Sequence, residues 1–300
     1  MSESGWSAEI SLSCDYSAPV IDLHAHSNRS DGKDSPTELV ENAKAAGVSV
    51  LAITDHDSTS GWSEAITALR PSLSLVLGAE ISTLTLDGIS VHMLGLLFDG
   101  EDKNMQNMLA ESRDTRIPRM RKMIDLLAAD GINISIEDVM AATPVGATLG
   151  RPHLADALVA RGHVASREEA FAALLHNKSK YYINHYSPSP VDAIKLIKAA
   201  GGVAVIAHPL ASQRGRTISM DLFDQLIAAG LDGVEVDHRD HSEIEKSELL
   251  RLAIERDLII TGSSDYHGTG KLNQLAEYTT HPRQWEALEV RAKSRRVVQR

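Results

Sequence analysis

Residues 21–26 read Ile21-Asp22-Leu23-His24-Ala25-His26, an apolar run that ends in two histidines. Residues two apart on a strand point to the same face, so His24 and His26 could bind one metal ion together. By itself this His-x-His pattern is weak evidence, because histidines at a strand edge also serve as ordinary surface polar groups. Its meaning depends on whether other strands end in the same way.

Several other apolar runs do end in histidine or carboxylate. They are Ile53-Thr54-Asp55-His56-Asp57, Val76-Leu77-Gly78-Ala79-Glu80, Val91-His92, Val205-Ile206-Ala207-His208-Pro209, Val234-Glu235-Val236-Asp237-His238 and Ile259-Ile260-Thr261-Gly262-Ser263-Ser264-Asp265-Tyr266-His267. Strands that deliver such groups at their carboxyl ends, repeated around a sheet, build metal sites in α/β barrels. On buried strands these charges would be unpaired unless a cation neutralised them. The sequence therefore predicts an α/β metalloenzyme.

The types of side chain narrow the choice of metal. Cys14 is the only cysteine, which excludes disulfides within the chain and clusters of metal-bound thiolates. Mixed imidazole and carboxylate ligands favour manganese, iron or zinc over calcium or magnesium. The candidate ligands outnumber those that one ion takes. We therefore expect two or three divalent ions, with Mn²⁺ as the first choice and Fe²⁺ or Zn²⁺ as alternatives. Glu80, expected at the end of the third strand, is suited to bridge two of them.

The composition excludes some classes of partner. The net charge of -11 argues against stable binding of duplex nucleic acid, which needs clustered basic residues. A small phosphorylated substrate is compatible with it, because metal ions and local arginines can reverse the field inside a pocket. No apolar run approaches the roughly 20 residues that span a bilayer. The polar N-terminus lacks the basic start and apolar stretch of a secretory signal. With a single cysteine, these features predict a cytoplasmic protein without a membrane partner.

Residues 18–100 show the alternation of strands and helices that is typical of α/β proteins. Ser35-Pro36-Thr37-Glu38 predicts a helix start with an N-cap, an early proline and a capping-box glutamate, and Gly47 predicts its end. Residues 82–97 predict a hairpin that turns at Asp87-Gly88. Strands are expected over 18–24, 48–54 and 73–80.

Residues 101–185 contain no convincing strand and predict a helical insertion. One long helix is expected over 102–129, followed by short helices at 136–140, 152–160 and 167–175. The alternation resumes over 186–282, so 18–100 and 186–282 are expected to form one discontinuous barrel. Residues 1–17 and 283–300 are terminal segments, and we expect the arginine-rich second one to be a solvated helix end. The later elements are expected as helices 191–200, 219–229 and 242–256 and strands 202–207, 231–237 and 257–262.

The order of these motifs resembles the PHP (polymerase and histidinol phosphatase) family. Within it, the chain is most similar to stand-alone phosphoesterases that act on nucleoside 3′,5′-bisphosphates and short oligonucleotides. The resemblance spans residues 21–267 and includes Gly150-Arg151-Pro152-His153 in the insertion. It implies a distorted TIM-like (β/α)7 barrel that holds a trinuclear metal centre.

The resemblance also implies a division of the ligands. One ion would take His24, His26, Glu80 and Asp265. A second would share Glu80 and add His92 and His208, and a third would take Asp31, His56 and His267. Asp55, Asp57 and Glu235 would orient ligand imidazoles from behind.

The implied reaction is in-line attack on phosphorus by a hydroxide that bridges metal ions. The chain lacks a Gly-x-Ser-x-Gly elbow and a P-loop, which agrees with a reaction that needs no serine nucleophile. Our candidates for catalytic residues beside the ligands are His238, as the acid that protonates the leaving group, and Asp55. His238 is equally explicable as a structural histidine.

The substrate is expected to be a nucleotide bisphosphate or a short 5′-phosphorylated oligonucleotide. Arg151 and His153 precede or begin a helix, where a phosphate could meet a guanidinium and the helix N-terminus. Lys180 and Arg116 are weaker candidates, since Arg116 more often would lie on a solvated helix face. Two alternatives stay open: a small-metabolite phosphatase, such as one for histidinol phosphate, and a PHP module that serves as a non-catalytic interaction domain.

Overall fold

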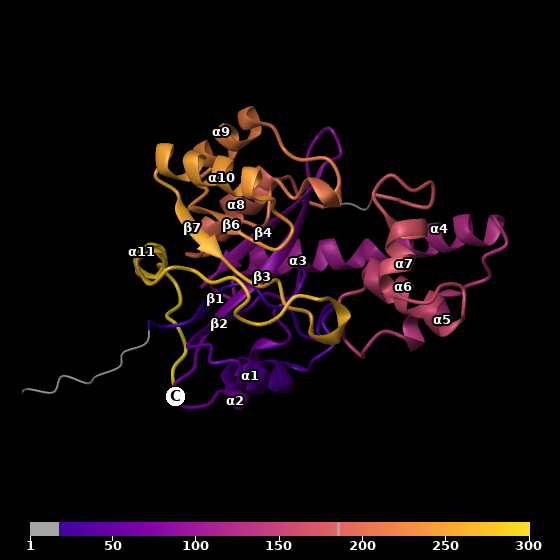
Figure 1. Ribbon diagram of the computed structural model, residues 1–300, viewed down its shortest axis with the longest axis horizontal. Coiled ribbons are helices and arrows are strands. Elements are labelled where there is room, and N and C mark those ends of the chain that lie inside the picture. Colours follow the sequence, from indigo (N-terminus) through magenta and orange to yellow (C-terminus); the bar gives the residue numbers. More distant parts are fainter. Residues whose placement is uncertain (1–17, 185–186) are drawn as a thin grey trace, which may run out of the picture.

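The computed structural model describes residues 18–184 and 187–300 and shows a barrel-like sheet surrounded by helices, with a helical body at one side (Figure 1). The expected terminal segment 1–17 lies outside the described residues, and so does the expected domain boundary at 185–186. Among the described residues no helix is both long and apolar enough to cross a membrane.

The sheet has seven strands in the order of the chain, which confirms the expected barrel-like α/β fold. β1 to β3 run parallel, and so do β5 to β7, whereas β4 is antiparallel to both of its neighbours. A bridge between Ala25 and Tyr266 brings the two edge strands together, so the ring is nearly closed. The strands are β1 (Ile21–Asp22), β2 (Val50–Ile53), β3 (Ser74–Leu84), β4 (Ser90–Leu96), β5 (Val203–Ile206), β6 (Gly233–Asp237) and β7 (Ile259–Gly262).

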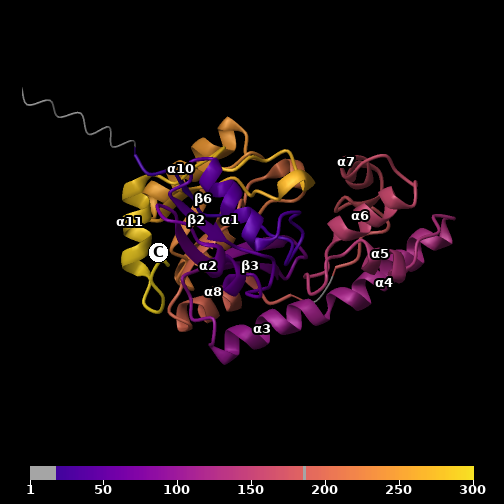
Figure 2. The ribbon, with the colours of Figure 1, turned by 90° about the horizontal axis from the view of Figure 1, so that it is seen from below.

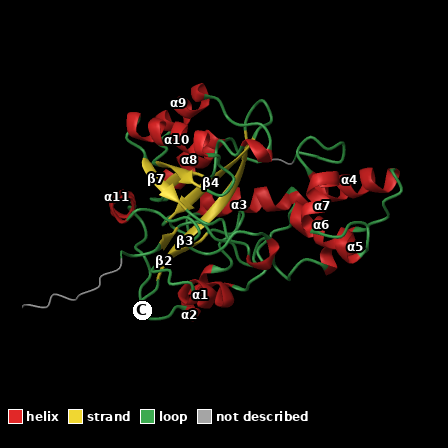
Figure 3. Cartoon of the chain, in the orientation of Figure 1, coloured by secondary structure: helices red, strands yellow, loops and turns green. Residues whose placement is uncertain are grey.

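Helices cover the outside of this sheet (Figure 3). The first begins as expected, because Ser35 and Glu38 form a capping box at its N-terminus. The short helix α2 was not expected from the sequence. The helices of the barrel are α1 (Pro36–Ala45), α2 (Trp62–Ala68), α3 (Lys103–Asp114), α8 (Pro190–Ala199), α9 (Met220–Ala228), α10 (Glu243–Glu255) and α11 (Pro282–Arg291).

Alternation along the strands separates an inner from an outer apolar cluster. Inward side chains such as Val50, Val76 and Val205 share a cluster with Trp285 and Leu288 of α11, so this helix packs against the barrel interior. The alternate side chains pack outward against the helices. The same period of two aims polar residues further along each strand into the barrel.

Of the arginine-rich segment 283–300, residues 283–291 are indeed helical and belong to α11, but that helix buries Trp285 and Leu288, and residues 292–300 are not helical, so the rest of the expectation was wrong. After α11 the chain is extended, and Val298 exchanges two backbone hydrogen bonds of 2.9 Å with Leu75 at the start of β3. Arg295 N donates to the carbonyl oxygen of Leu97 at 3.2 Å. The end of the segment is therefore held by one isolated antiparallel bridge beside the start of β3.

The insertion has a core of its own. The long helix expected over 102–129 is two helices, α3 and α4 (Arg116–Ala129), which follow one another as a rod from the barrel into the insertion (Figure 2). Met105 and Leu109 of α3 pack on the barrel, whereas Met120 and Leu127 of α4 belong to the insertion core. The remaining insertion elements are α5 (Ile136–Ala141), α6 (Arg151–Ala160), α7 (Arg167–Ala170) and a π-helical turn, η1 (Phe171–Leu175).

Candidate active site

The candidate metal ligands converge at one end of the barrel. Val76 and Glu80 are four residues apart on β3, so both side chains point to the same face of the strand, and both are buried inside the barrel. Glu80 is not at the end of its strand, because β3 continues into the hairpin. His92 lies near the start of β4 rather than at its end, since that strand runs antiparallel. The other candidate ligands lie in loops after strands: His24, His26 and Asp31 after β1, His56 after β2, His208 after β5, and Asp265 and His267 after β7.

The first group contains His24, His26, Glu80 and Asp265, which offer ligand atoms within 4.8 Å of one another. The Nε2 atoms of His24 and His26 lie 3.0 Å apart, and His26 Nε2 is 3.0 Å from Glu80 Oε2. Asp265 Oδ1 lies 3.4 Å from His26 Nε2. All four side chains are buried. This set equals the one expected for the first ion.

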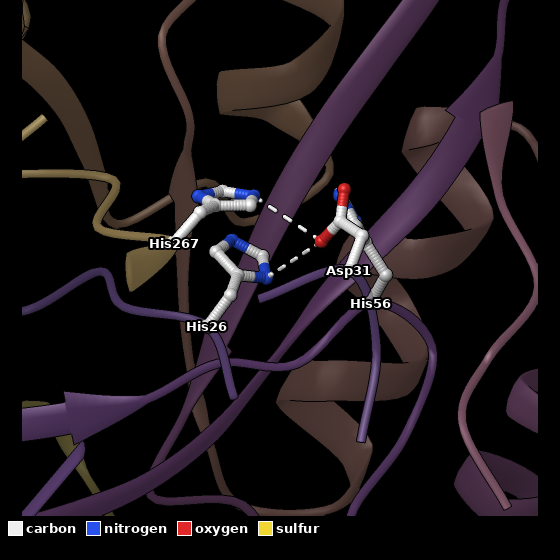
Figure 4. Close-up of side chains that lie close together, drawn as sticks. All are labelled: His26, Asp31, His56 and His267. Atoms are coloured by element: carbon white, nitrogen blue, oxygen red, sulfur yellow. Dashed lines mark ion pairs between the residues drawn. The ribbon is translucent and has the colours of Figure 1, made fainter. Parts of the chain in front are cut away.

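The second group contains His26, Asp31, His56 and His267 (Figure 4). Asp31 Oδ1 lies 3.2 Å from His267 Nε2 and 3.8 Å from His26 Nδ1. The rings of His26 and His267 are stacked with 4.1 Å between their centroids. His26 therefore stands between two groups, and the others are the set expected for the third ion.

The third group is built around the other oxygen of Glu80. His92 Nδ1 lies 2.7 Å and His208 Nε2 lies 3.0 Å from Glu80 Oε1. His56 also joins Glu80 and His92 within 4.8 Å. Because Oε2 faces His24, His26 and His56 while Oε1 faces His92 and His208, Glu80 has the geometry of a bridging ligand.

Several atoms at this place are buried without a hydrogen-bond partner among the described residues. They include Asp31 Oδ1, His56 Nδ1 and His267 Nε2, whose nearest ligand atoms lie 3.1–3.2 Å away without forming a hydrogen bond of good geometry. An unsatisfied buried polar atom costs about 1–3 kcal/mol. A divalent ion would satisfy all three, and nitrogen and oxygen donors without sulfur suit manganese, iron or zinc. The residues therefore fit the expected metal ions.

Comparisons with known proteins agree with this geometry. The PHP domain family model matches residues 22–181. A 3′,5′-nucleoside bisphosphate phosphatase of Chromobacterium violaceum is 34% identical over 84% of this chain and 88% of its own length. A 5′-3′ exoribonuclease of Haemophilus influenzae is 37% identical over 82% of this chain and 89% of its own. A solved structure of a proposed metal-dependent phosphoesterase from Bifidobacterium adolescentis is 41% identical, with a TM-score of 0.86 over 92% of this chain and 98% of that one.

The chain belongs to the PHP family. As a PHP protein with these relatives it is a hydrolase that acts on phosphoester bonds. Its cluster of histidine, aspartate and glutamate side chains is the place where a divalent metal would bind.

Burial keeps two imidazoles of the PHP centre neutral. It lowers the pKa of His208 to about 3, helped by the nearby guanidinium of Arg214. It lowers the pKa of His267 to about 4, helped by the ammonium of Lys271. A neutral imidazole has the free lone pair that a metal needs.

At His26 the neighbouring carboxylates raise the pKa instead of lowering it. Burial lowers the pKa of His26, but the surrounding carboxylates, Asp265 and Glu80 foremost, outweigh burial and raise that pKa to about 9. Burial likewise raises the pKa of Glu80, but the imidazoles, His56 foremost, hold it well below its usual range. The concentration of negative charge that attracts a proton to His26 would also attract a metal ion, which would compete with that proton.

The backbone is strained where three of the strands end. Asp57, His208 and Asp265 have φ angles of 49°, 53° and 51°, in the left-handed region. Residues other than glycine avoid this region, and such strain gathers at functional sites. Here the turn aims His208 and Asp265 toward Glu80 and His24.

The structure places Asp55 and His238 behind the ligands rather than in the cavity. Asp55 is buried and accepts hydrogen bonds from Ser27 and Ser30, so it shapes the loop after β1. His238 Nδ1 accepts from the backbone N–H of Asp240, and its Nε2 lies 3.4 Å from Asp265 Oδ2. Neither residue lines the cavity.

A cavity of about 790 Å³ separates the ligand cluster from the insertion. Arg116 lines it and is buried, with bonds to Asp57 Oδ2, Ser82 Oγ and the carbonyl oxygen of Leu149. The expected solvated face for Arg116 was therefore wrong. Arg151 also lines the cavity, and its guanidinium lies 4.9 Å from the centre of the Tyr182 ring.

The cavity does not include the other two expected phosphate ligands. His153 Nδ1 accepts from the backbone N–H of Gly150 and so caps α6. Lys180 has a side chain 69% exposed and pairs with Asp130. Neither is among the lining residues.

Six basic residues of the cavity were not singled out from the sequence: Arg119, Arg167, Arg214, Arg216, Arg239 and Lys271. Arg119 follows Arg116 by three positions on α4, so helical spacing could have placed both on one face. Arg214 Nη2 and Lys271 Nζ donate to Asp265 Oδ2 at 2.8 and 3.0 Å. No sequence pattern pointed to these two, because Arg214 ends the short 3-10 turn η2 (Ser212–Arg214) and Lys271 follows the short 3-10 turn η3 (Gly268–Gly270).

Proposed function

We propose that this PHP hydrolase cleaves phosphoester bonds of nucleoside 3′,5′-bisphosphates, of short 5′-phosphorylated oligonucleotides, or of both. One observation carries this proposal: the ligand cluster and a group of guanidiniums face each other across a single cavity. Such a cavity suits a substrate with two anionic groups, one for each wall.

On the barrel wall, the three ligand groups would hold two or three divalent ions, Mn²⁺ first and Fe²⁺ or Zn²⁺ otherwise. Such ions activate a bound water molecule and neutralise charge on the phosphoryl group. The protein's own part is to fix the ligands. Glu235 Oε1 lies 3.2 Å from His24 Nδ1, and Arg214 and Lys271 hold the outer oxygen of Asp265.

On the insertion wall, two guanidiniums have no carboxylate partner within ion-pair distance among residues 18–184 and 187–300. They are Arg119 and Arg151, and both lie over the ring of Tyr182. Burial and the proximity of Arg151 lower the pKa of Arg119 to about 9. Two crowded cations favour an anion between them, and a guanidinium pairs with phosphate through two hydrogen bonds. We infer that the second phosphate binds here.

We also propose that His238 positions Asp265 instead of protonating the leaving group. Its Nδ1 is used by the Asp240 N–H, and its Nε2 is turned toward Asp265. A proton donor has to reach the leaving oxygen in the cavity. His238 is fully buried and does not line that space.

The alternative phosphatase for a small metabolite would use the same metal ligands. Histidinol phosphate carries one phosphate and an ammonium group, so it would gain nothing from Arg119 and Arg151. A non-catalytic module would not need intact ligand groups, and here all three groups are formed.

The test compares kcat/KM for adenosine 3′,5′-bisphosphate, adenosine 5′-monophosphate, a ladder of 5′-phosphorylated oligonucleotides and histidinol phosphate, with Mn²⁺ present. Arg151→Gln and Arg119→Gln should each lower kcat/KM for the bisphosphate by about 10–100-fold, the worth of a charge-assisted hydrogen bond. The monophosphate should lose much less. Arg121→Gln, on the exposed side of α4, is the matched control. Preference for histidinol phosphate would overturn the proposal.

A further inference from the structure

The second ligand group consists of His26, Asp31, His56 and His267 and is called the Asp31 group below. Its ligands lie in loops, and the loops that carry Asp31, His56 and His267 each contact the insertion. Asp31 lies in the loop 27–34, His56 in the loop 54–58, and His267 in the loop 263–271. The first group differs, because Glu80 lies within a strand and His24 is braced by Glu235 of the barrel.

The loop that carries Asp31 is held at both ends. Thr148 of the insertion donates its backbone N–H to the carbonyl oxygen of Arg29 at 2.9 Å. Lys33 Nζ donates to Asp156 Oδ2 of α6 at 2.7 Å. Asp31 stands between these two anchors, two residues from each.

The loop that carries His267 is held by Arg167 of the insertion, which is itself bound to the carboxylate of Asp156. Arg167 forms a fork on Asp156, with Nε to Oδ1 at 2.5 Å and Nη2 to Oδ2 at 2.6 Å. Its remaining Nη1 donates to the carbonyl oxygen of Gly270 at 3.3 Å. The approach is close, since a Cβ on Gly270 would lie 2.4 Å from that nitrogen. Lys33 N also donates to the carbonyl oxygen of His267 at 3.0 Å, which joins the two loops.

The residue after His56 is bound to the insertion as well. Arg116 of α4 pairs with the Asp57 carboxylate, and Arg113 Nη1 of the barrel helix α3 donates to the Asp57 carbonyl oxygen at 2.5 Å. Each of the three loops therefore contacts at least one side chain or backbone group of the insertion.

We propose that Asp156, Arg167 and Lys33 are positioning residues for the Asp31 group: docking of the insertion through them sets the affinity of that group for its metal ion. The groups around Glu80 share His26 and His56 with the Asp31 group, but Glu80, His92 and His24 would still hold their ions from the barrel. This inference rests on the proposed metal centre. Because coupling is reciprocal, filling the Asp31 group would in turn stabilise the docked insertion that carries Arg119 and Arg151.

The experiment measures bound Mn²⁺ per chain against free Mn²⁺ by equilibrium dialysis and elemental analysis. Asp31→Asn should lose the ion of the Asp31 group and so gives the reference for the absence of that ion. Arg167→Gln and Asp156→Asn should show the same missing ion at free Mn²⁺ that saturates the others, and should regain it at about 10–100-fold higher concentration, as for other residues that orient ligands. Arg167→Lys should recover part of the affinity. Arg251→Gln, which breaks an exposed pair with Glu255, should match the wild type.

A double variant separates positioning from general damage. Asp31→Asn with Arg167→Gln should bind no fewer ions than Asp31→Asn alone. Unchanged binding in Arg167→Gln and Asp156→Asn, an equal loss of every ion, or no loss in Asp31→Asn would each overturn the inference. If Arg167→Gln or Asp156→Asn fails to fold, Lys33→Gln must show the selective loss of this ion instead. The Lys33 side chain is 38% exposed, so this change is milder. If the wild-type protein binds all its ions but cleaves no nucleotide, the proposed function is contradicted. The metal-binding measurements on the variants would still test the inference.

Discussion

The two carboxylate oxygens of Asp265 face different surroundings. Oδ1 lies 3.4–3.5 Å from the Nε2 atoms of His26 and His24, while Oδ2 receives Arg214 and Lys271. The cations outside fix the plane of the carboxylate, so Oδ1 is left for a metal. At Asp265, one carboxylate oxygen is thus available to a metal ion, while Arg214 and Lys271 fix the orientation of the carboxylate through the other oxygen.

His26 belongs to two ligand groups, so its loss should be more severe than that of a residue in one group. We expect His26→Ala to lower kcat by roughly 10²–10⁴-fold, because several kcal/mol of charge stabilisation are lost with the metal. Circular dichroism should be unchanged. His163→Ala, at an exposed histidine of the insertion, is the control, and wild-type turnover by His26→Ala would contradict the ligand assignment.

Arg116 is a buried cation paired with the buried Asp57. Arg116→Met should lower the free energy of unfolding by about 3–5 kcal/mol, because it leaves that carboxylate without a partner. Adding Asp57→Asn should restore part of the loss. Urea denaturation measures both, and Arg121→Met on the same helix should change stability by less than about 0.5 kcal/mol. Equal stability of Arg116→Met and wild type would refute the role of the pair.

Sequence reasoning was strongest for residues tied to strands. Strand spacing was enough to propose Glu80, since a period of two fixes which side chains share a face. It also proposed His24 and His26, although they lie just after β1, on either side of the bridge residue Ala25. It misjudged Arg116 and gave no reason to choose Arg119 or Arg214. Helical periodicity shows which residues share a face, and it does not show which part of the chain covers that face.

Among the elements, α6 and α7 meet the barrel through Asp156. Burial raises the pKa of this carboxyl, but Arg167 and Lys33 outweigh burial and lower it below 3.8. A lowered folded-state pKa contributes stability above the unfolded value, and that contribution is lost as the pH falls through the folded value. We therefore expect the difference in unfolding free energy between wild type and Asp156→Asn to shrink below about pH 4. Thermal denaturation between pH 3 and 7 measures it, and a constant difference would speak against the charge pair.

The residues after α11 should contribute to stability through the backbone hydrogen bonds between Val298 and Leu75. Val298→Pro removes the N–H that donates to the carbonyl oxygen of Leu75 and should cost about 1–3 kcal/mol. Val298→Ala keeps that bond and shows the part due to the side chain. Melting temperatures of the two variants compare these effects, and identical values would mean that the pairing is unimportant.

At this scale the sequence predicted most elements and missed how two of them pair. Capping signals located α1, and Asp87-Gly88 located the turn before β4. The antiparallel direction of β4 follows from that hairpin, yet its consequence for His92 was not recognised. Pairing of Val298 with Leu75 joins residues far apart in the chain, and local patterns carry no information about such contacts.

In the whole molecule, metal binding and folding should be linked. Ligands that bind only the folded state stabilise it by about 2.7 kcal/mol at a concentration 100 times the Kd. Removal of metal with EDTA should therefore lower the melting temperature by roughly 5–10 °C. Mn²⁺ should restore it in the wild type and much less in His26→Ala. An unchanged melting temperature in EDTA would argue against tightly bound ions.

The bridge between Ala25 and Tyr266 has a consequence for biosynthesis. His24 leaves the ribosome long before His267, and at about 5–20 residues per second the interval is roughly 10–50 s. During that time the first strand of the nascent chain has no seventh-strand neighbour, and the early histidines have no Asp265 beside them. The two groups that include Asp265 or His267 are therefore completed only when translation of the barrel is nearly finished, whereas His56, Glu80 and His92 are all synthesised early.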